Sequence, residues 1–169
     1  KTTYMYVNNH FIGFHRLAIN GLVNGDQPIH HKTDIQESIL ICNGEIYNYK
    51  QLASELNITF KTNSDCEIII HLYKKFGIEY CLQVLDGVFA FVLVDKQLKK
   101  TFAARDPYGI RPLYYSIINN GNIYMASELK MIYNLLKYKD RIFNFKPGRY
   151  LVTDLFTNIY KIYPYRKYP

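Results

Sequence analysis

The residues best suited to chemistry in this 169-residue chain lie in the run Cys42-Asn43-Gly44-Glu45. An apolar segment, residues 39–42, leads directly into Asn43-Gly44, a pair that is typical of a sharp turn with outward-facing backbone N–H groups. Such donors beside an amide side chain are what an acyl-transfer site uses to hold a developing oxyanion. The run is therefore a candidate for stabilising negative charge on oxygen.

Two charged residues around that run could hold the head group of an α-amino acid. Arg16 can clamp a carboxylate with its planar fork, and Asp65 can accept from an ammonium. Each also has a structural interpretation. Arg16 interrupts an apolar stretch, where an ion pair would satisfy it. Asp65 follows Ser64 at a predicted helix start, where the helix dipole stabilises an acid by about 0.3–1 kcal/mol.

Over most of its length the chain resembles the glutaminase domain of glutamine-hydrolysing asparagine synthetase, an N-terminal-nucleophile amidotransferase. The resemblance runs from about Phe14 to Tyr150 and keeps the family's order. Its segments are GFHRLAI, NGEIYN, SDCEIIIHLY, DGVFAFVLVD and RDPYGIRPLYY. The last of these is dense in turn formers, and we interpret it as mainly structural.

The resemblance implies a role for each candidate residue in binding glutamine. The side chain of Asn43 and the N–H of Gly44 would form the oxyanion hole. Arg16 would hold the α-carboxylate, and Glu45 and Asp65 would bind the α-amino group. Backbone groups just after Arg16 would line the pocket, namely those of Leu17, Ala18, Ile19 and Asn20.

The family's nucleophile is an N-terminal cysteine, whose free α-amine serves as general base. Cys42, Cys66 and Cys81 all lie inside the chain and have no free amine. We therefore expect the chain to lack the family's first residues, and to bind glutamine without hydrolysing it. The alternative is a catalytically silent scaffold, as in β-lactam synthetases, which resemble the family and lack the cysteine. The retained amino-acid clamp favours the enzyme.

Hydrophobic periodicity and turn signals predict the elements around these residues. Strands are expected at 11–19, 39–42 and 149–152, and hairpins at 88–94 with 101–104 and at 113–118 with 122–125. Helices are expected at 47–56, from a Ser64–Glu67 capping box to Gly77, and from 127 to 136. Hairpins with interspersed helices favour an α+β fold with antiparallel sheets. The resemblance adds the αββα sandwich of the N-terminal-nucleophile hydrolases.

Composition narrows the function classes. The chain is 49% hydrophobic and 21% charged, as in soluble globular proteins, and has no apolar run long enough to span a membrane. Its net charge of +7 comes from scattered residues, so nucleic acid is not an expected partner. His30-His31 lacks ligand-spaced Cys or acidic residues, so we predict no metal site. Three cysteines without CxxC spacing suit a reducing compartment, and we expect a cytoplasmic protein.

We assign residues 1–153 to an N-terminally incomplete glutaminase domain and 154–169 to the start of a linker towards an absent synthetase domain. The resemblance implies glutamine as the ligand and no cofactor in this domain. ATP and Mg²⁺ would bind only in the synthetase domain, where aspartate is activated for amidation by the ammonia released. That C-terminal domain is the expected partner, and a homodimer is left open.

Overall fold

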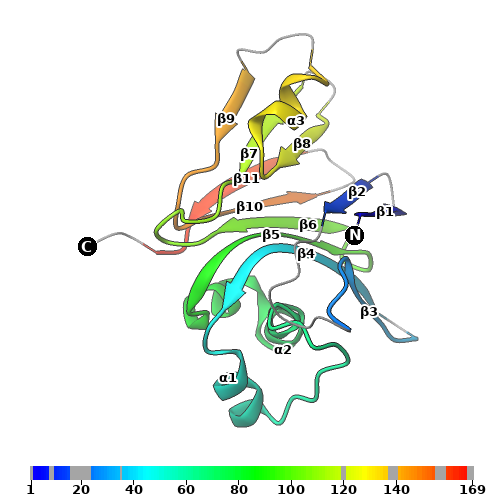
Figure 1. Ribbon diagram of the computed structural model, residues 1–169, viewed down its shortest axis with the longest axis vertical. Helices are drawn as coiled ribbons and strands as arrows, with labels where there is room; N and C mark the ends of the chain where they lie inside the picture. The colour runs from blue at the N-terminus through cyan, green and yellow to red at the C-terminus, as the bar shows by residue number, and fades with distance from the viewer. Residues whose placement is uncertain are drawn as a thin grey trace.

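The computed structural model describes residues 2–7, 10–15, 24–34, 36–118, 121–136, 141–154 and 159–166. These residues form antiparallel sheets and helices (Figure 1). The largest sheet has the strand order β11-β10-β6-β5-β4-β3. Its strands are β3 (Ile29–Lys32), β4 (Glu37–Ile46), β5 (Gly87–Asp95), β6 (Lys100–Arg105), β10 (Arg149–Asp154) and β11 (Tyr160–Pro164).

Two smaller sheets and the helices complete the described fold. A hairpin joins β1 (Thr2–Val7) to β2 (His10–His15), and a three-stranded sheet has the order β8-β7-β9. The strands of that sheet are β7 (Tyr114–Ile117), β8 (Ile123–Ala126) and β9 (Ile142–Asn144). The helices are α1 (Tyr49–Leu56), α2 (Glu67–Val84) and α3 (Leu129–Tyr133). No helix in the described part of the chain is long and apolar enough to cross a membrane.

The two-residue period of the strands divides the core between two faces of the large sheet. On β5, Phe89 and Phe91 belong to the cluster between the large sheet and the helices α1 and α2. Ala90 belongs to a second cluster with Leu113 and Phe145. Helix α3 contacts β7, β8 and β9. The layers are therefore helices, large sheet, small sheet and helix, as expected for an αββα sandwich, with α1 and α2 below the large sheet in Figure 1.

The β1–β2 hairpin covers another part of the same face as the small sheet. Ile12 packs against Ile39 of β4 and Val94 of β5, with Met5 beside them. This contact places the hairpin over the strand that carries the candidate oxyanion residues. The sequence predicted strand 11–19 here; β2 ends at His15, and residues 16–19 lie outside the described residues.

Helix α2 differs from its prediction at both ends. Gly77, the expected end, has φ 83°, but a second helical segment continues to Val84. It continues because Ile78, Cys81 and Leu82 keep an apolar face that is buried under the sheet. The capping box was wrong: Ser64 makes no side-chain cap, and the N-cap is Cys66.

Several strands were not predicted. These are β1, β3, β9 and β11. Each is short or carries several polar or exposed residues, so its pattern is weak outside its sheet. Strand β11 pairs with β10 from Arg149–Pro164 to Thr153–Tyr160. The large sheet thus reaches into the segment that the sequence analysis gave to a linker. Both predicted hairpins are confirmed as antiparallel pairs.

Candidate active site

Asn43 and Gly44 lie inside strand β4, so the predicted sharp turn was wrong. Strand β4 bends along its length (Figure 1) and stays paired with β5 as far as Ile46. A Cβ atom on Gly44 would lie 2.2 Å from the carbonyl oxygen of Val88 and 2.7 Å from the Cα of Phe89. Gly44 is therefore required for the close approach of two backbones, a role that glycine has in strands as well as in turns.

The backbone N–H of Gly44 faces an edge of β4 that none of the described strands covers. Antiparallel strands direct the backbone groups of successive residues to alternate edges. Cys42 and Ile46 direct theirs away from β5, and β3 pairs with β4 only as far as Leu40. Gly44 has the same parity as these residues. Among the described residues none accepts its N–H, which is therefore available to a ligand.

Side chains hold the backbone on both sides of that N–H. The N–H of Cys42 donates to the side-chain oxygen of Gln27 at 2.6 Å, and the N–H of Ile46 donates to a carboxylate oxygen of Asp65 at 2.6 Å. The donor at Gly44 thus lies between two amides that are already satisfied. These two hydrogen bonds fix the direction of the Gly44 N–H and leave that N–H itself without a bond to the described residues.

The side chain of Asn43 provides a second donor next to the first. Cys42 and Ile46 point into the core between the large sheet and the helices, whereas Ile39 and Ile41 point to the opposite face of the sheet. By alternation, Asn43 and Glu45 project from that opposite face, and both are half-buried. The amide of Asn43 makes no hydrogen bond within the described part of the chain. Together Asn43 and Gly44 offer two adjacent N–H donors, the pattern that an oxyanion hole needs.

Asp65 lies against the same strand. Its side chain is buried, with 4% of the residue exposed, and it precedes α2. The thiol of Cys66 lies 3.9 Å from the carbonyl oxygen of Gly44 and 4.0 Å from the Asp65 carboxylate. Chain folding therefore brings Asp65 next to Gly44, although 20 residues separate them in the sequence. The other predicted pocket residues, Arg16, Leu17, Ala18, Ile19 and Asn20, lie outside the described residues.

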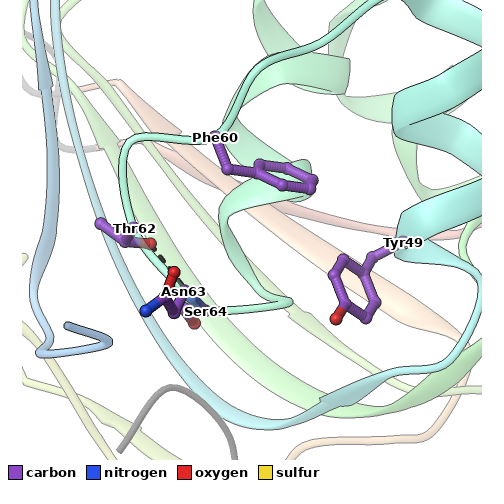
Figure 2. Close-up of a pocket in the computed structure, with 5 residues that line it drawn as sticks. All are labelled: Tyr49, Phe60, Thr62, Asn63 and Ser64. Atoms are coloured by element: carbon purple, nitrogen blue, oxygen red, sulfur yellow. Dashed lines mark hydrogen bonds between the residues drawn. The ribbon is translucent and has the colours of Figure 1, made fainter. Parts of the chain in front are cut away.

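The loop before Asp65 borders an open pocket of about 270 Å³. Figure 2 shows Thr62, Asn63 and Ser64 on that loop, with Phe60 above them and Tyr49 opposite, at the start of α1. Neither Asn43 nor Gly44 lines this pocket, so the pocket adjoins the candidate site without containing its donors. The sequence analysis did not predict it.

Glu67 fixes this loop in place. Its carboxylate accepts the N–H groups of Lys61 at 2.8 Å and Thr62 at 2.7 Å, and it also contacts His71 at 3.1 Å. Burial by itself raises the pKa of Glu67, but these hydrogen bonds outweigh burial and lower the pKa to about 2. Glu67 is therefore ionised at neutral pH and holds the chain that leads into Asp65.

The cysteines of the chain are poorly placed to act as nucleophiles. Cys42, Cys66 and Cys81 are all buried. Contact with Cys66 and burial both raise the pKa of Cys42 well above its ordinary range, and burial raises that of Cys81. A reactive cysteine needs an accessible thiol with a lowered pKa. In the described residues no group of His, Cys, Asp and Glu side chains is arranged to hold a metal ion.

The RDPYGIR segment is structural, as predicted. Arg105 donates to the carbonyl oxygens of Gly109, Arg111 and Phe145, each within 2.7 Å. Asp106 accepts backbone N–H groups from the turn that follows it. Sequence reasoning missed Gln27, which is buried and bound to Cys42. Its only signal was a long polar side chain in a segment otherwise made of turn formers.

Comparison with known proteins shows the family to which this fold belongs. Residues 1–164 match the family model of the glutamine amidotransferase domain. The chain belongs to this family, which confirms the resemblance found in the sequence.

Individual relatives narrow the comparison further. A probable asparagine synthetase [glutamine-hydrolyzing] of Acanthamoeba polyphaga mimivirus is 45% identical over 147 residues, which cover 86% of this chain and 26% of the relative. The asparagine synthetase [glutamine-hydrolyzing] of Gallus gallus is 44% identical over 147 residues, covering 85% and 26%. The chain thus spans about a quarter of the length of the curated relatives that it matches.

A solved structure supports the fold. The glutamine phosphoribosylpyrophosphate amidotransferase from B. subtilis superposes with a TM-score of 0.73 and 26% identity. The match covers 91% of this chain and 34% of that protein. The α+β fold of antiparallel sheets is therefore that of a glutamine amidotransferase domain.

Proposed function

We propose that this domain binds glutamine and, within a longer parent protein, takes part in its hydrolysis to glutamate and ammonia. The observation that carries the proposal is the pair of adjacent donors on β4, the N–H of Gly44 and the amide of Asn43, beside the buried carboxylate of Asp65. Membership of the glutamine amidotransferase family supports it.

In this proposal each residue has one task. Arg16 binds the α-carboxylate of glutamine, with the backbone from Leu17 to Asn20 beside it, and Asp65 with Glu45 binds the α-ammonium. These contacts place the side-chain amide carbon of glutamine near the Asn43 and Gly44 donors. When a thiolate adds to that carbon, the carbonyl oxygen becomes an oxyanion, and the two donors stabilise it.

The reaction then proceeds in two stages. Collapse of the tetrahedral intermediate breaks the C–N bond, and the amide nitrogen leaves as ammonia with the proton that the free α-amine of the nucleophilic residue took from its thiol. The resulting thioester is hydrolysed by water through a second tetrahedral intermediate, which uses the same donors and releases glutamate. No described residue supplies the thiolate, because the cysteines here are buried. We propose that a cysteine preceding Lys1 in the parent provides it, and that the 169-residue chain binds glutamine without turning it over.

We further propose that the parent is an asparagine synthetase. Its curated relatives carry that name and are about four times as long as the matched region. The remaining chain would bind ATP and Mg²⁺ and use the ammonia to amidate aspartate. We place the parent in the cytoplasm, because buried free thiols suit a reducing compartment, and we leave a homodimer as part of the proposal.

Calorimetry on the 169-residue chain tests the binding step. We expect L-glutamine to bind and D-glutamine to bind more weakly, because the α-carboxylate, the α-ammonium and the side chain can reach their three proposed contacts together in only one enantiomer. The same chain should release no glutamate. Failure to bind L-glutamine, with the chain folded by circular dichroism, would contradict the proposal.

Expression of the parent protein tests the chemistry. We expect its mature N-terminus to be cysteine, seen by intact mass after iodoacetamide treatment, and expect alkylation to abolish glutamate release. Asparagine formation from aspartate, ATP and added ammonia should survive alkylation. A mature N-terminus without cysteine would leave the silent scaffold as the correct interpretation.

A further inference from the structure

Beyond Leu40, side chains bond the outer edge of β4, and no strand among the described residues pairs with it there. The last pair between β3 and β4 is Ile29 with Leu40. The next residue that faces this edge is Cys42, and both of its backbone groups are bound by the side chain of Gln27. Gly44 follows on the same edge, and none of the described residues accepts its N–H.

Gln27 contacts Cys42 as a neighbouring strand would. Its Nε2 donates to the carbonyl oxygen of Cys42 at 2.9 Å, and its Oε1 accepts the N–H of Cys42 at 2.6 Å. This two-way exchange is that of a hydrogen-bonded pair in an antiparallel sheet. Gln27 is 8% exposed, so water does not compete for either bond.

We propose that Gln27 is a positioning residue of the amidotransferase site, whose side-chain amide bonds Cys42 as a strand partner would and so directs the N–H of Gly44 at the oxyanion. The inference rests on the proposed function. Gln27 does not touch the substrate in this scheme. It acts through the backbone of Cys42, two residues before the donor and on the same edge.

Two contacts make the position of the Gly44 backbone sensitive to Gln27. On the inner side, Gly44 packs directly on the backbone of Val88 and Phe89, so β4 cannot move towards β5. On the outer side, the loop that carries Gln27 is bound to the loop before Asp65, because Asn63 donates its N–H to the carbonyl oxygen of Asn24 at 2.6 Å. Gln27 therefore links β4 to the loop that leads to Asp65, the residue proposed to bind the ammonium group.

A purely structural role would also satisfy the buried backbone groups of Cys42, so the test must separate the two. The variant is Gln27→Met in the parent protein, which keeps the side-chain length and loses both hydrogen bonds. The matched control is Gln36→Met in the turn between β3 and β4, where the exposed Gln36 bonds Thr33 through its backbone. Gln27→Asn keeps the amide group but moves it one methylene further from Cys42, and it replaces Gln27→Met in the test if that variant does not fold.

We expect Gln27→Met and Gln27→Asn to lower kcat for glutamine hydrolysis by about 10- to 100-fold, because a displacement of about 1 Å at a catalytic group can cost that much. The KM for glutamine and ammonia-dependent asparagine formation should stay within about twofold of wild type. Glutamate γ-semialdehyde adds a thiol to give a hemithioacetal, a tetrahedral adduct whose oxygen would occupy the position of the oxyanion. Its affinity should fall by a factor similar to that of kcat, while glutamate affinity does not.

The outcomes separate this inference from the proposed function. If wild type hydrolyses glutamine and the Gln27 variants keep its kcat and its aldehyde affinity, the inference is overturned. The same holds if the variants lose glutamine and ammonia activities equally, because Gln27 then supports only the fold. If wild type itself hydrolyses no glutamine, the proposed function fails instead.

Discussion

The carboxylate of Asp65 accepts the backbone N–H of Ile46 at 2.6 Å. The residue proposed to bind the substrate ammonium therefore also supports β4, the strand that carries Asn43 and Gly44. Asp65 is almost fully buried, and Ile46 faces the same edge of β4 as Gly44. In the proposed function, one side chain therefore couples the position of the substrate head group to the position of the Gly44 donor. Substitution of Asp65 should show two separable effects.

Asp65→Ala should lower the free energy of unfolding by about 1–3 kcal/mol, because the N–H of Ile46 would be left buried without an acceptor. Asp65→Asn keeps an acceptor oxygen and should cost under about 1 kcal/mol. Both variants should lose glutamine binding, because both remove the charge that faces the ammonium. Urea unfolding and calorimetry on the 169-residue chain measure the two effects. An Asp65→Asn variant that binds glutamine normally would limit Asp65 to the structural role.

Glu67 should make stability fall at acid pH. Its pKa in the folded protein is about 2, below its ordinary value of 4.5. A carboxylate with a depressed folded pKa stabilises the protein above its unfolded pKa, and this contribution is lost as pH falls towards the folded pKa. Glu67→Gln should therefore destabilise the chain by about 1–3 kcal/mol at pH 7. The difference from wild type should shrink between pH 4.5 and 2.

Urea unfolding of both proteins at pH 7, 4 and 2.5 checks this dependence. Glu55→Gln is the control, because Glu55 is exposed on α1 and, among the described residues, bonds only Gln51 of the same helix. Its effect should stay under about 0.5 kcal/mol. A Glu67→Gln penalty that does not change with pH would mean that the carboxylate does not titrate as stated.

Gly44→Ala should be among the most destabilising single-methyl changes in the chain. The added Cβ would lie 2.2 Å from a backbone oxygen of β5, which cannot rotate away as a side chain can. We expect a loss of about 3 kcal/mol or more. In Gly13→Ala the new Cβ meets the side-chain rings of Tyr4 at 3.4 Å and Phe11 at 3.9 Å, and the loss should stay under about 1 kcal/mol. Melting temperatures of the two variants measure the contrast, and similar values would contradict it.

An element of the fold was predicted correctly where its own sequence has a clear hydrophobic pattern. The β5–β6 hairpin has strong apolar runs and a polar turn, and its prediction was confirmed. Strand β3, with the sequence IHHK, has one buried residue and gains its structure only by pairing with β4. Gly77 was correctly identified as a helix break, but the segment after it folds back into helix because the sheet buries it. Such tertiary effects are not visible in a local window.

The candidate site shows the same division. The NGEIYN motif predicted the candidate donor residues, and the sequence suggested a turn where the structure has a strand paired with β5. The need for glycine was clear, whereas its cause was a backbone contact with residues more than 40 positions away. Gln27 could not be assigned, since its partner Cys42 is 15 residues distant and its role depends on where β3 ends.

Two asparagines five residues apart allow the oxyanion role to be separated from folding. The amide of Asn43 bonds none of the described residues and faces the same region as Glu45. The amide of Asn48 is used by the fold: it donates to the carbonyl oxygen of Val84 at 2.8 Å, and its oxygen accepts the N–H of Asp86 at 3.0 Å. The two Asn→Ala variants remove the same atoms from these different surroundings.

In the parent protein, Asn43→Ala should lower kcat for glutamine hydrolysis by about 10²–10³, the cost of losing one oxyanion donor, with little change in KM. Its melting temperature should match wild type, because no bond within the described fold is lost. Asn48→Ala should instead lower the free energy of unfolding by about 1–3 kcal/mol and leave kcat within about threefold at temperatures where it is folded. If Asn43→Ala raises KM and spares kcat, Asn43 binds the ground state and is no oxyanion donor. If it fails to fold, its amide is part of the fold, as that of Asn48 is.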